Sequence, residues 1–183
     1  MKKTKKILLI SSVFLVALLI LAFTPSKKEI HQNEKVIEAP KDIVWEVISD
    51  VGNYNKYATS LTEVKIVSGK GKGMVRSCAH GDDKWTEICS NWDEGKSYSF
   101  NVNTGEGFPY PFKIFNGTWS IEEKTKNKTK LIVRFEYQFP QRWMQWFFSR
   151  DTHIALDEGN TVLIDNWEKK ILENYKFLSH KSK

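Results

Sequence analysis

Residues 159–178 read GNTVLIDNWEKKILENYKFL, and this stretch near the end of the 183-residue chain decides the fold. Apolar residues recur in it at intervals of three or four, at Leu163, Trp167, Ile171, Tyr175 and Leu178. That spacing is typical of one face of an α-helix. The opposite face carries charged residues, among them Asp165 and Glu173. We therefore expect a long C-terminal helix, beginning near Gly159, with water on one side and a sheet on the other.

The chain before this helix alternates between apolar and polar residues in short runs, which is typical of strands. Turn residues separate the runs, for example over 69–73 and over 124–130. The predicted strands cover about 34–38, 63–68, 74–79, 85–92, 98–103, 113–122 and 131–139. A helix over 41–49 that begins after Pro40, and a short helix or turn over 54–61, follow the first strand. The predicted class is α+β, with a curved antiparallel sheet wrapped around the long C-terminal helix.

Three short motifs accompany this order of elements. Ala39-Pro40-x-x-Ile43-Val44-Trp45 opens the first helix, Asp50-x-x-x-Tyr54 closes it, and Gly71-x-Gly73 lies between two strands. Together with the order of elements from Glu34 to Leu178, they resemble the START-like superfamily, and more narrowly its polyketide cyclase/dehydrase and lipid-transport group, SRPBCC. The resemblance implies a helix-grip fold whose cavity holds mostly apolar small molecules or lipids. Several members of the group are catalytic, so the fold alone does not decide activity.

An internal cavity is also expected on physical grounds. One helical stripe cannot fill the space enclosed by a sheet of about six strands, so part of that space stays open to a guest. Aromatic and aliphatic residues that alternate along two strands, and two on the helix, would face it. The candidate ligand-binding residues are Tyr98, Phe100, Phe135, Tyr137, Trp167 and Ile171. The alternative interpretation is that all six belong to a solid core.

Composition and charge disfavour several other classes of function. The net charge is +6, but residues 1–35 hold 7 lysines against 2 acidic residues, so the remainder is almost neutral. A nucleic-acid-binding domain needs a surplus of basic residues on one face, and we expect no such partner. The 2 cysteines form no C-x-x-C motif, so we expect neither a metal nor a cofactor.

The first 25 residues predict a membrane segment. Four lysines precede the apolar run from Ile7 to Phe23, which contains no charge. A helix of that length spans about 26 Å, near the lower limit for crossing a bilayer. More lysines precede the run than follow it, and this excess places the N-terminus in the cytoplasm and the domain outside. We predict a signal anchor over 1–25, a linker over 26–33 and the START-like domain over 34–180, with secretion after cleavage as the alternative.

An aromatic segment precedes the predicted C-terminal helix. It contains Trp143, Met144, Trp146, Phe147 and Phe148. Three functions are compatible with it: a lid on the cavity, a surface that dips into the membrane, or a docking surface for a partner protein. The structural alternative is a short helix packed on the sheet edge.

Catalytic motifs of the common hydrolase, metalloprotease and nucleotide-binding kinds are absent from the sequence. The candidates for acid–base chemistry are His80 and Glu87. Arg76 and His80 alternate along one strand, and some registers of the hairpin let Glu87 on the partner strand approach either of them. Cys78 and Cys89 would form a disulfide only if the turn between these strands centred on Asp83 and Lys84, and we favour two small buried side chains. The predicted function is membrane-tethered binding or transport of a hydrophobic molecule, with a cyclase or dehydratase and a protein-interaction module as alternatives.

Overall fold

A computed structural model describes the backbone of residues 2–181 and the side chains of residues 11–179 and 181. Seven antiparallel strands form one sheet in the order β1-β7-β6-β5-β4-β3-β2. The strands are β1 (Glu29–Ile37), β2 (Glu63–Ser68), β3 (Val75–His80), β4 (Asp83–Asp93), β5 (Ser97–Val102), β6 (Ile114–Thr125) and β7 (Lys128–Gln138). The helices are α1 (Lys2–Ala22), α2 (Lys41–Ile48), the 3-10 helix η1 (Val51–Lys56) and α3 (Arg142–Lys181).

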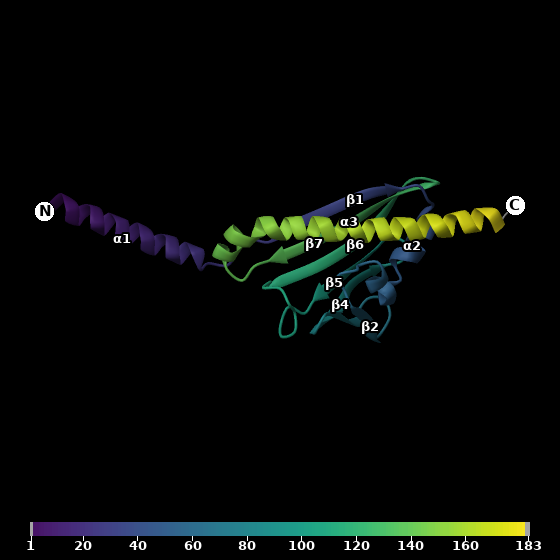
Figure 1. The fold of residues 1–183 in the computed structure, drawn as a ribbon, viewed down its shortest axis with the longest axis horizontal. Coiled ribbons are helices and arrows are strands. Elements are labelled where there is room, and N and C mark those ends of the chain that lie inside the picture. The colour runs from purple at the N-terminus through teal and green to yellow at the C-terminus, as the bar shows by residue number, and fades with distance from the viewer. Residues whose placement is uncertain (1, 182–183) are drawn as a thin grey trace.

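The topology is that of a helix-grip fold. Strands β2 to β7 pair with their neighbours in chain order, and β1 pairs with β7 at the far edge. Helix α3 runs along one face of the curved sheet, and α2 and η1 lie near its C-terminal half (Figure 1). The predicted α+β class and the helix-grip arrangement are confirmed.

Helix α3 is longer than its sequence period indicates. It begins at Arg142, not near Gly159, and continues for 40 residues. The aromatic segment predicted to precede it therefore forms its first turns. Gly159 lies inside the helix, where a Cβ atom would meet nothing within 4 Å. A single exposed glycine costs a helix only about 1 kcal/mol, so it does not end one that packs on a sheet on both sides of it.

Strand β1 also begins earlier than expected. Glu29 pairs with Tyr137 and the register continues to Ile37, so residues 29–33 of the predicted linker belong to the sheet. Alternate side chains of β1 are polar and form hydrogen bonds with α3. Asn33 donates to Asp157 (2.7 Å) and Lys35 donates to Asp165 (2.8 Å). An apolar pattern was absent because this contact between strand and helix is polar.

The region after α2 differs by a few residues from its prediction. The short helix over 54–61 is found as η1 at Val51–Lys56. Cys78 and Cys89 are both free and buried, as favoured, because Cys78 lies opposite Trp85 in the register of β3 and β4.

Helix α1 extends away from the domain (Figure 1). Its apolar side chains from Val13 to Leu21 are largely exposed. In the part of the chain that the structure describes, no helix is long and apolar enough to cross a membrane. Met1 and the side chains of residues 2–10, which include the lysines used to predict orientation, lie outside the described residues.

Candidate functional site

A cavity of about 310 Å³ lies between the sheet and the N-terminal half of α3. This volume is at the lower end of the range of about 300–1,000 Å³ typical of small-molecule sites. Aromatic side chains from three adjacent strands and the loop before β6 form one part of its wall. They are Phe100, Phe108, Phe112, Phe115, Trp119 and Phe135.

Two of the six predicted ligand-binding residues, Phe100 and Phe135, line this cavity. Tyr98 does not, because its ring stacks between Trp92 (5.5 Å between centroids) and Trp119 (5.0 Å). Its hydroxyl donates to the carbonyl oxygen of Ile48 (2.8 Å). Strand alternation correctly indicated the inward face, but the cavity occupies only part of that face.

The other three predicted residues also lie outside the cavity wall. Trp167 and Ile171 are fully buried in the core, where Trp167 packs against the rings of Tyr54 and Tyr57. Tyr137 packs in a second aromatic cluster, and its hydroxyl donates to the carboxylate of Glu29 (3.0 Å). The C-terminal half of α3 thus fills the core, whereas its N-terminal half covers the cavity.

Sequence reasoning missed two parts of the wall. Phe108, Tyr110 and Phe112 come from the loop between β5 and β6. Three aromatic residues within five positions of a turn-rich loop were the available signal. The helix contributes small residues, Ala155 and Gly159, and these leave space that larger side chains would occupy.

A buried ion pair forms the polar side of the cavity. Arg76 on β3 donates to the Oε2 atom of Glu87 on β4, from Nε (2.8 Å) and from Nη2 (2.6 Å). The indole of Trp85 donates to the other carboxylate oxygen (3.0 Å). The guanidinium also lies over the ring of Phe100, 4.0 Å from its centroid. Both charged residues line the cavity and are otherwise shielded from water.

The electrostatics around Arg76 favour its charged form. Burial opposes the charge of Arg76, but the Glu87 carboxylate outweighs it and raises the pKa of the guanidinium above its ordinary value. Burial likewise raises the pKa of Tyr54 and of the Cys78 thiol, so both stay neutral. The cavity therefore presents one compensated ion pair within an apolar wall.

His80 does not join Glu87 in an acid–base pair. Glu87 lies opposite Arg76, whereas His80 lies opposite Asp83, four residues or about 13 Å further along β3. His80 is exposed at the mouth of the cavity, and its Nδ1 atom is 2.6 Å from the carbonyl oxygen of Ser60. The hairpin register, which one sequence could not determine, separates the two groups.

The aromatic segment at the start of α3 does not include any of the residues that line the cavity. Trp143 and Met144 are partly buried, and Met144 packs against the cluster formed by Phe112, Tyr137 and Phe139. Trp146, Phe147 and Phe148 are exposed by 54%, 71% and 43%. We call these three residues the apolar patch. It adjoins the end of α1, because the backbone nitrogen of Arg142 donates to the carbonyl oxygen of Thr24 (2.8 Å).

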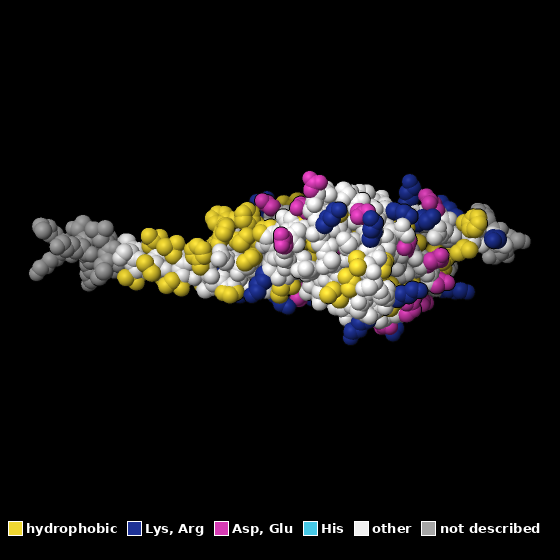
Figure 2. Space-filling view, turned by 90° about the horizontal axis from the view of Figure 1, so that it is seen from below, with side chains coloured by type: hydrophobic (Ala, Val, Ile, Leu, Met, Phe, Trp, Pro, Cys, Tyr) yellow, Lys and Arg dark blue, Asp and Glu magenta, His cyan; other side chains and the backbone are white. Residues whose placement is uncertain are grey.

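Hydrophobic side chains continue from α1 to the adjoining end of the domain (Figure 2). Lys27 and Lys28 lie five and six residues after the end of α1 at Ala22, and Arg142 and Arg150 flank the apolar patch in the sequence. An apolar surface bordered by basic residues is compatible with contact to anionic lipid headgroups.

A curved antiparallel sheet that grips a long helix around an aromatic cavity defines a helix-grip protein with a hydrophobic ligand-binding fold. The family model described as "Polyketide cyclase / dehydrase and lipid transport" matches residues 31–161. The chain belongs to this family. Comparison with curated proteins found no match.

Solved structures with the same fold have low sequence identity to this chain. The Zhui aromatase/cyclase from Streptomyces sp. R1128 is 18% identical, with a TM-score of 0.56 over 76% of this chain and 94% of that one. Norcoclaurine synthase from Thalictrum flavum is 14% identical, with a TM-score of 0.65 over 82% and 98%. The protein TTHA0849 from Thermus thermophilus is 18% identical, with a TM-score of 0.63 over 80% and 99%. At these identities the likeness shows the fold alone.

Proposed function

We propose that the protein binds a compact, ring-containing apolar molecule in the cavity between the sheet and α3. The observation that carries this proposal is the aromatic wall around about 310 Å³. Burying about 200 Å² of apolar ligand surface there contributes about 5 kcal/mol before association costs. The modest volume favours a small ring system over a lipid with two acyl chains.

The ion pair suggests which polar group the ligand carries. Arg76 and Glu87 satisfy each other, so the ligand needs no charge to enter. A hydroxyl or carbonyl group on the ligand would form a hydrogen bond with an atom of the pair that still has a free donor or acceptor position. Norcoclaurine synthase, which shares the fold, was solved with dopamine and hydroxybenzaldehyde, two hydroxylated aromatic molecules.

A binding experiment with blocked variants tests the cavity. Tryptophan fluorescence would follow titration of the protein with 2-naphthol, 4-hydroxybenzaldehyde and decanoate. Ala155→Phe places a ring in the cavity wall and should weaken binding of the aromatic probes at least tenfold. Ile154→Phe is the matched control, because Ile154 is exposed on the same helix and does not line the cavity. Equal affinities in the two variants would contradict binding in this cavity.

A cyclase or dehydratase activity is the second candidate. The observation in its favour is a buried carboxylate, Glu87, in an apolar cavity that also holds a guanidinium. Glu87 would accept a proton from the substrate and Arg76 would stabilise an enolate oxygen. Glu87→Gln should then abolish turnover of a poly-β-ketone substrate while its binding persists. Turnover that survives this substitution would remove Glu87 from the chemistry.

We propose further that the domain is tethered to a membrane, single-pass and extracytoplasmic, through the segment from Ile7 to Phe23. The run contains no charged residue, and the apolar patch adjoins its end. In this arrangement Trp146, Phe147 and Phe148 would rest on the lipid surface.

Two measurements test this arrangement. Protease added to intact cells should digest the domain, whereas a protected domain would contradict the orientation. Trp146→Ser combined with Phe147→Ser should reduce flotation of the chain lacking residues 1–25 with anionic vesicles. Unchanged flotation would instead favour the patch as a docking surface for a protein.

A further inference from the structure

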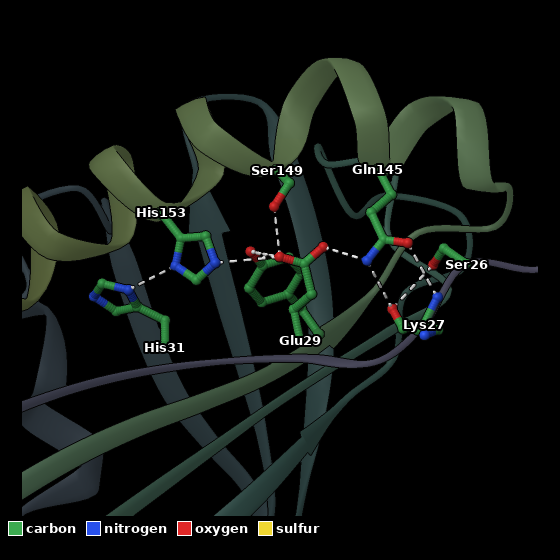
Figure 3. Close-up of polar contacts among 8 residues, drawn as sticks. Ser26, Lys27, Glu29, His31, Gln145, Ser149 and His153 are labelled. Atoms are coloured by element: carbon green, nitrogen blue, oxygen red, sulfur yellow. Dashed lines mark hydrogen bonds and ion pairs between the residues drawn. The ribbon is translucent and has the colours of Figure 1, made fainter.

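A cluster of polar side chains joins β1 to the N-terminal half of α3 (Figure 3). At its centre, the Nδ1 atom of His31 on β1 lies 3.0 Å from the Nδ1 atom of His153 on α3. The two ring centroids are 5.3 Å apart. The hydrogen bonds around these rings determine which nitrogen atoms carry hydrogen.

The other nitrogen of His153 faces a carboxylate. Its Nε2 atom is 3.2 Å from the Oε2 atom of Glu29. Glu29 also accepts from the hydroxyls of Tyr137 and Ser149 and from the amide of Gln145 (2.6 Å). A carboxylate only accepts hydrogen bonds, so Nε2 of His153 donates to it, as the other neighbours do, and carries the hydrogen.

The other nitrogen of His31 faces an amide oxygen. Its Nε2 atom is 2.8 Å from the Oδ1 atom of Asn33. The orientation of that amide is set, because its nitrogen donates to Asp157 and its oxygen also accepts from Asn160 (2.8 Å). An amide oxygen only accepts, so Nε2 of His31 carries the hydrogen as well.

In their neutral forms, each ring therefore directs its Nδ1 lone pair toward the Nδ1 atom of the other ring. Two lone pairs at 3.0 Å repel each other unless a cation lies between them. Adjacent nitrogen ligands of a tetrahedral zinc ion, each about 2.0–2.1 Å from the metal, are about 3.3 Å apart. In metal-binding histidines, the ring nitrogen that does not bind the metal also donates its hydrogen to a carboxylate or a similar acceptor. Glu29 and Asn33 are the acceptors here.

We propose that His31 and His153 bind a divalent transition-metal ion, zinc or copper, through their Nδ1 atoms. Imidazole nitrogen suits both ions. The exposed fractions of the side chains, 12% for His31 and 40% for His153, leave room for water ligands that complete the coordination. Within the described residues, no group of three or more histidine, cysteine, aspartate or glutamate side chains is arranged to hold a metal ion. The site thus offers two protein ligands, and it ties β1 to the half of α3 that covers the cavity.

The untagged full-length protein in detergent tests the proposal. Calorimetric titration with zinc chloride should give one ion per chain. Electron paramagnetic resonance of the copper-loaded protein should show coupling to two imidazole nitrogens. His31→Gln and His153→Gln should each weaken binding at least tenfold. Glu29→Gln should retain one site with affinity reduced about 10–100-fold.

His80→Gln is the matched control, since His80 lies at the cavity mouth and should leave binding unchanged. A copper spectrum without two coupled imidazole nitrogens would overturn the proposal, and this readout requires no variant to fold. The proposal would also be overturned if neither zinc nor copper bound at concentrations below 1 mM. A proton shared between the two rings would then account for the contact between them. Because neither histidine lines the cavity, failure here leaves the proposed ligand binding standing.

Discussion

At the scale of single residues, the shape of the cavity depends on a side chain that is missing. Gly117 on β6 pairs with Phe100 and lines the cavity. A Cβ atom at this position would lie 2.4 Å from the ring of Trp119 and 3.1 Å from that of Phe135. Glycine is therefore required for close approach, and the indole of Trp119 occupies the space above it.

Gly117→Ala should destabilise the protein by about 1–3 kcal/mol, because the Trp119 ring must move within a packed wall. Urea unfolding measures the difference. Gly159→Ala is the matched control in a cavity-lining position, where nothing lies within 4 Å of the added carbon. That substitution should stabilise α3 by up to about 1 kcal/mol. Equal effects of the two variants would contradict the tight contact at Gly117.

A second residue-scale prediction concerns the buried ion pair. Arg76→Met alone leaves the Glu87 carboxylate without its cation and should cost about 3–5 kcal/mol of unfolding free energy. Adding Glu87→Leu removes the stranded charge and should restore most of that loss. Denaturant unfolding of both single variants and the double variant forms a cycle. Additive losses would show that the two groups do not depend on each other.

At the scale of elements, α3 performs two tasks with two stretches of different composition. Its C-terminal half carries large apolar residues that fill the core, and its N-terminal half carries small and polar residues beside the cavity and β1. The loop between β5 and β6 forms another part of the cavity wall. Phe108 in this loop contacts the rings of Trp85 (5.3 Å) and Phe115 (5.8 Å).

The backbone of this loop approaches β4 closely at Gly107. A Cβ atom there would lie 2.1 Å from the carbonyl oxygen of Lys84. Gly107→Ala should lift the loop, so bound 2-naphthol should dissociate at least threefold faster in stopped-flow measurements. Gly81→Ala is the control, because Gly81 also has a positive φ but nothing lies within 4 Å of a Cβ atom added there. Equal dissociation rates in the two variants would contradict a role for the loop in closing the cavity.

At the scale of the whole molecule, the domain and α1 are joined at a narrow junction. The hydroxyl of Ser26 donates to the carbonyl oxygen of Phe139 (2.7 Å), and the sheet begins three residues later at Glu29. The structural elements that enclose the cavity and the β1–α3 cluster all lie after this junction. We therefore expect the domain to fold without α1.

A chain of residues 26–183 should accordingly unfold cooperatively, with a free energy within about 1 kcal/mol of the full-length protein. The expected difference is small because the hydrogen bond from Arg142 to Thr24, which the shorter chain loses, is worth about 1 kcal/mol. Circular dichroism during urea unfolding of both chains makes the comparison. Loss of cooperative unfolding in the shorter chain would show that α1 is part of the folding unit.

The periodicity of residues 163–178 and the alternation along the strands were sufficient to predict a curved antiparallel sheet around a long C-terminal helix, because burial on one face imposes those periods directly. The helix-grip fold itself was implied by the resemblance to the START-like superfamily. The same patterns identified Phe100 and Phe135 as inward-facing. They also drew attention to Arg76 and Glu87, although the predicted partner of Glu87 was His80.

Only the tertiary structure decided what depends on register and on contacts distant in sequence. The pairing of β3 with β4 places Arg76, not His80, beside Glu87. The path of α3 leaves Trp167 and Ile171 in the core and small residues over the cavity. The approach of His31 to His153 joins residues 122 positions apart. Local patterns specify the face of an element, whereas position along that face is set by packing between elements.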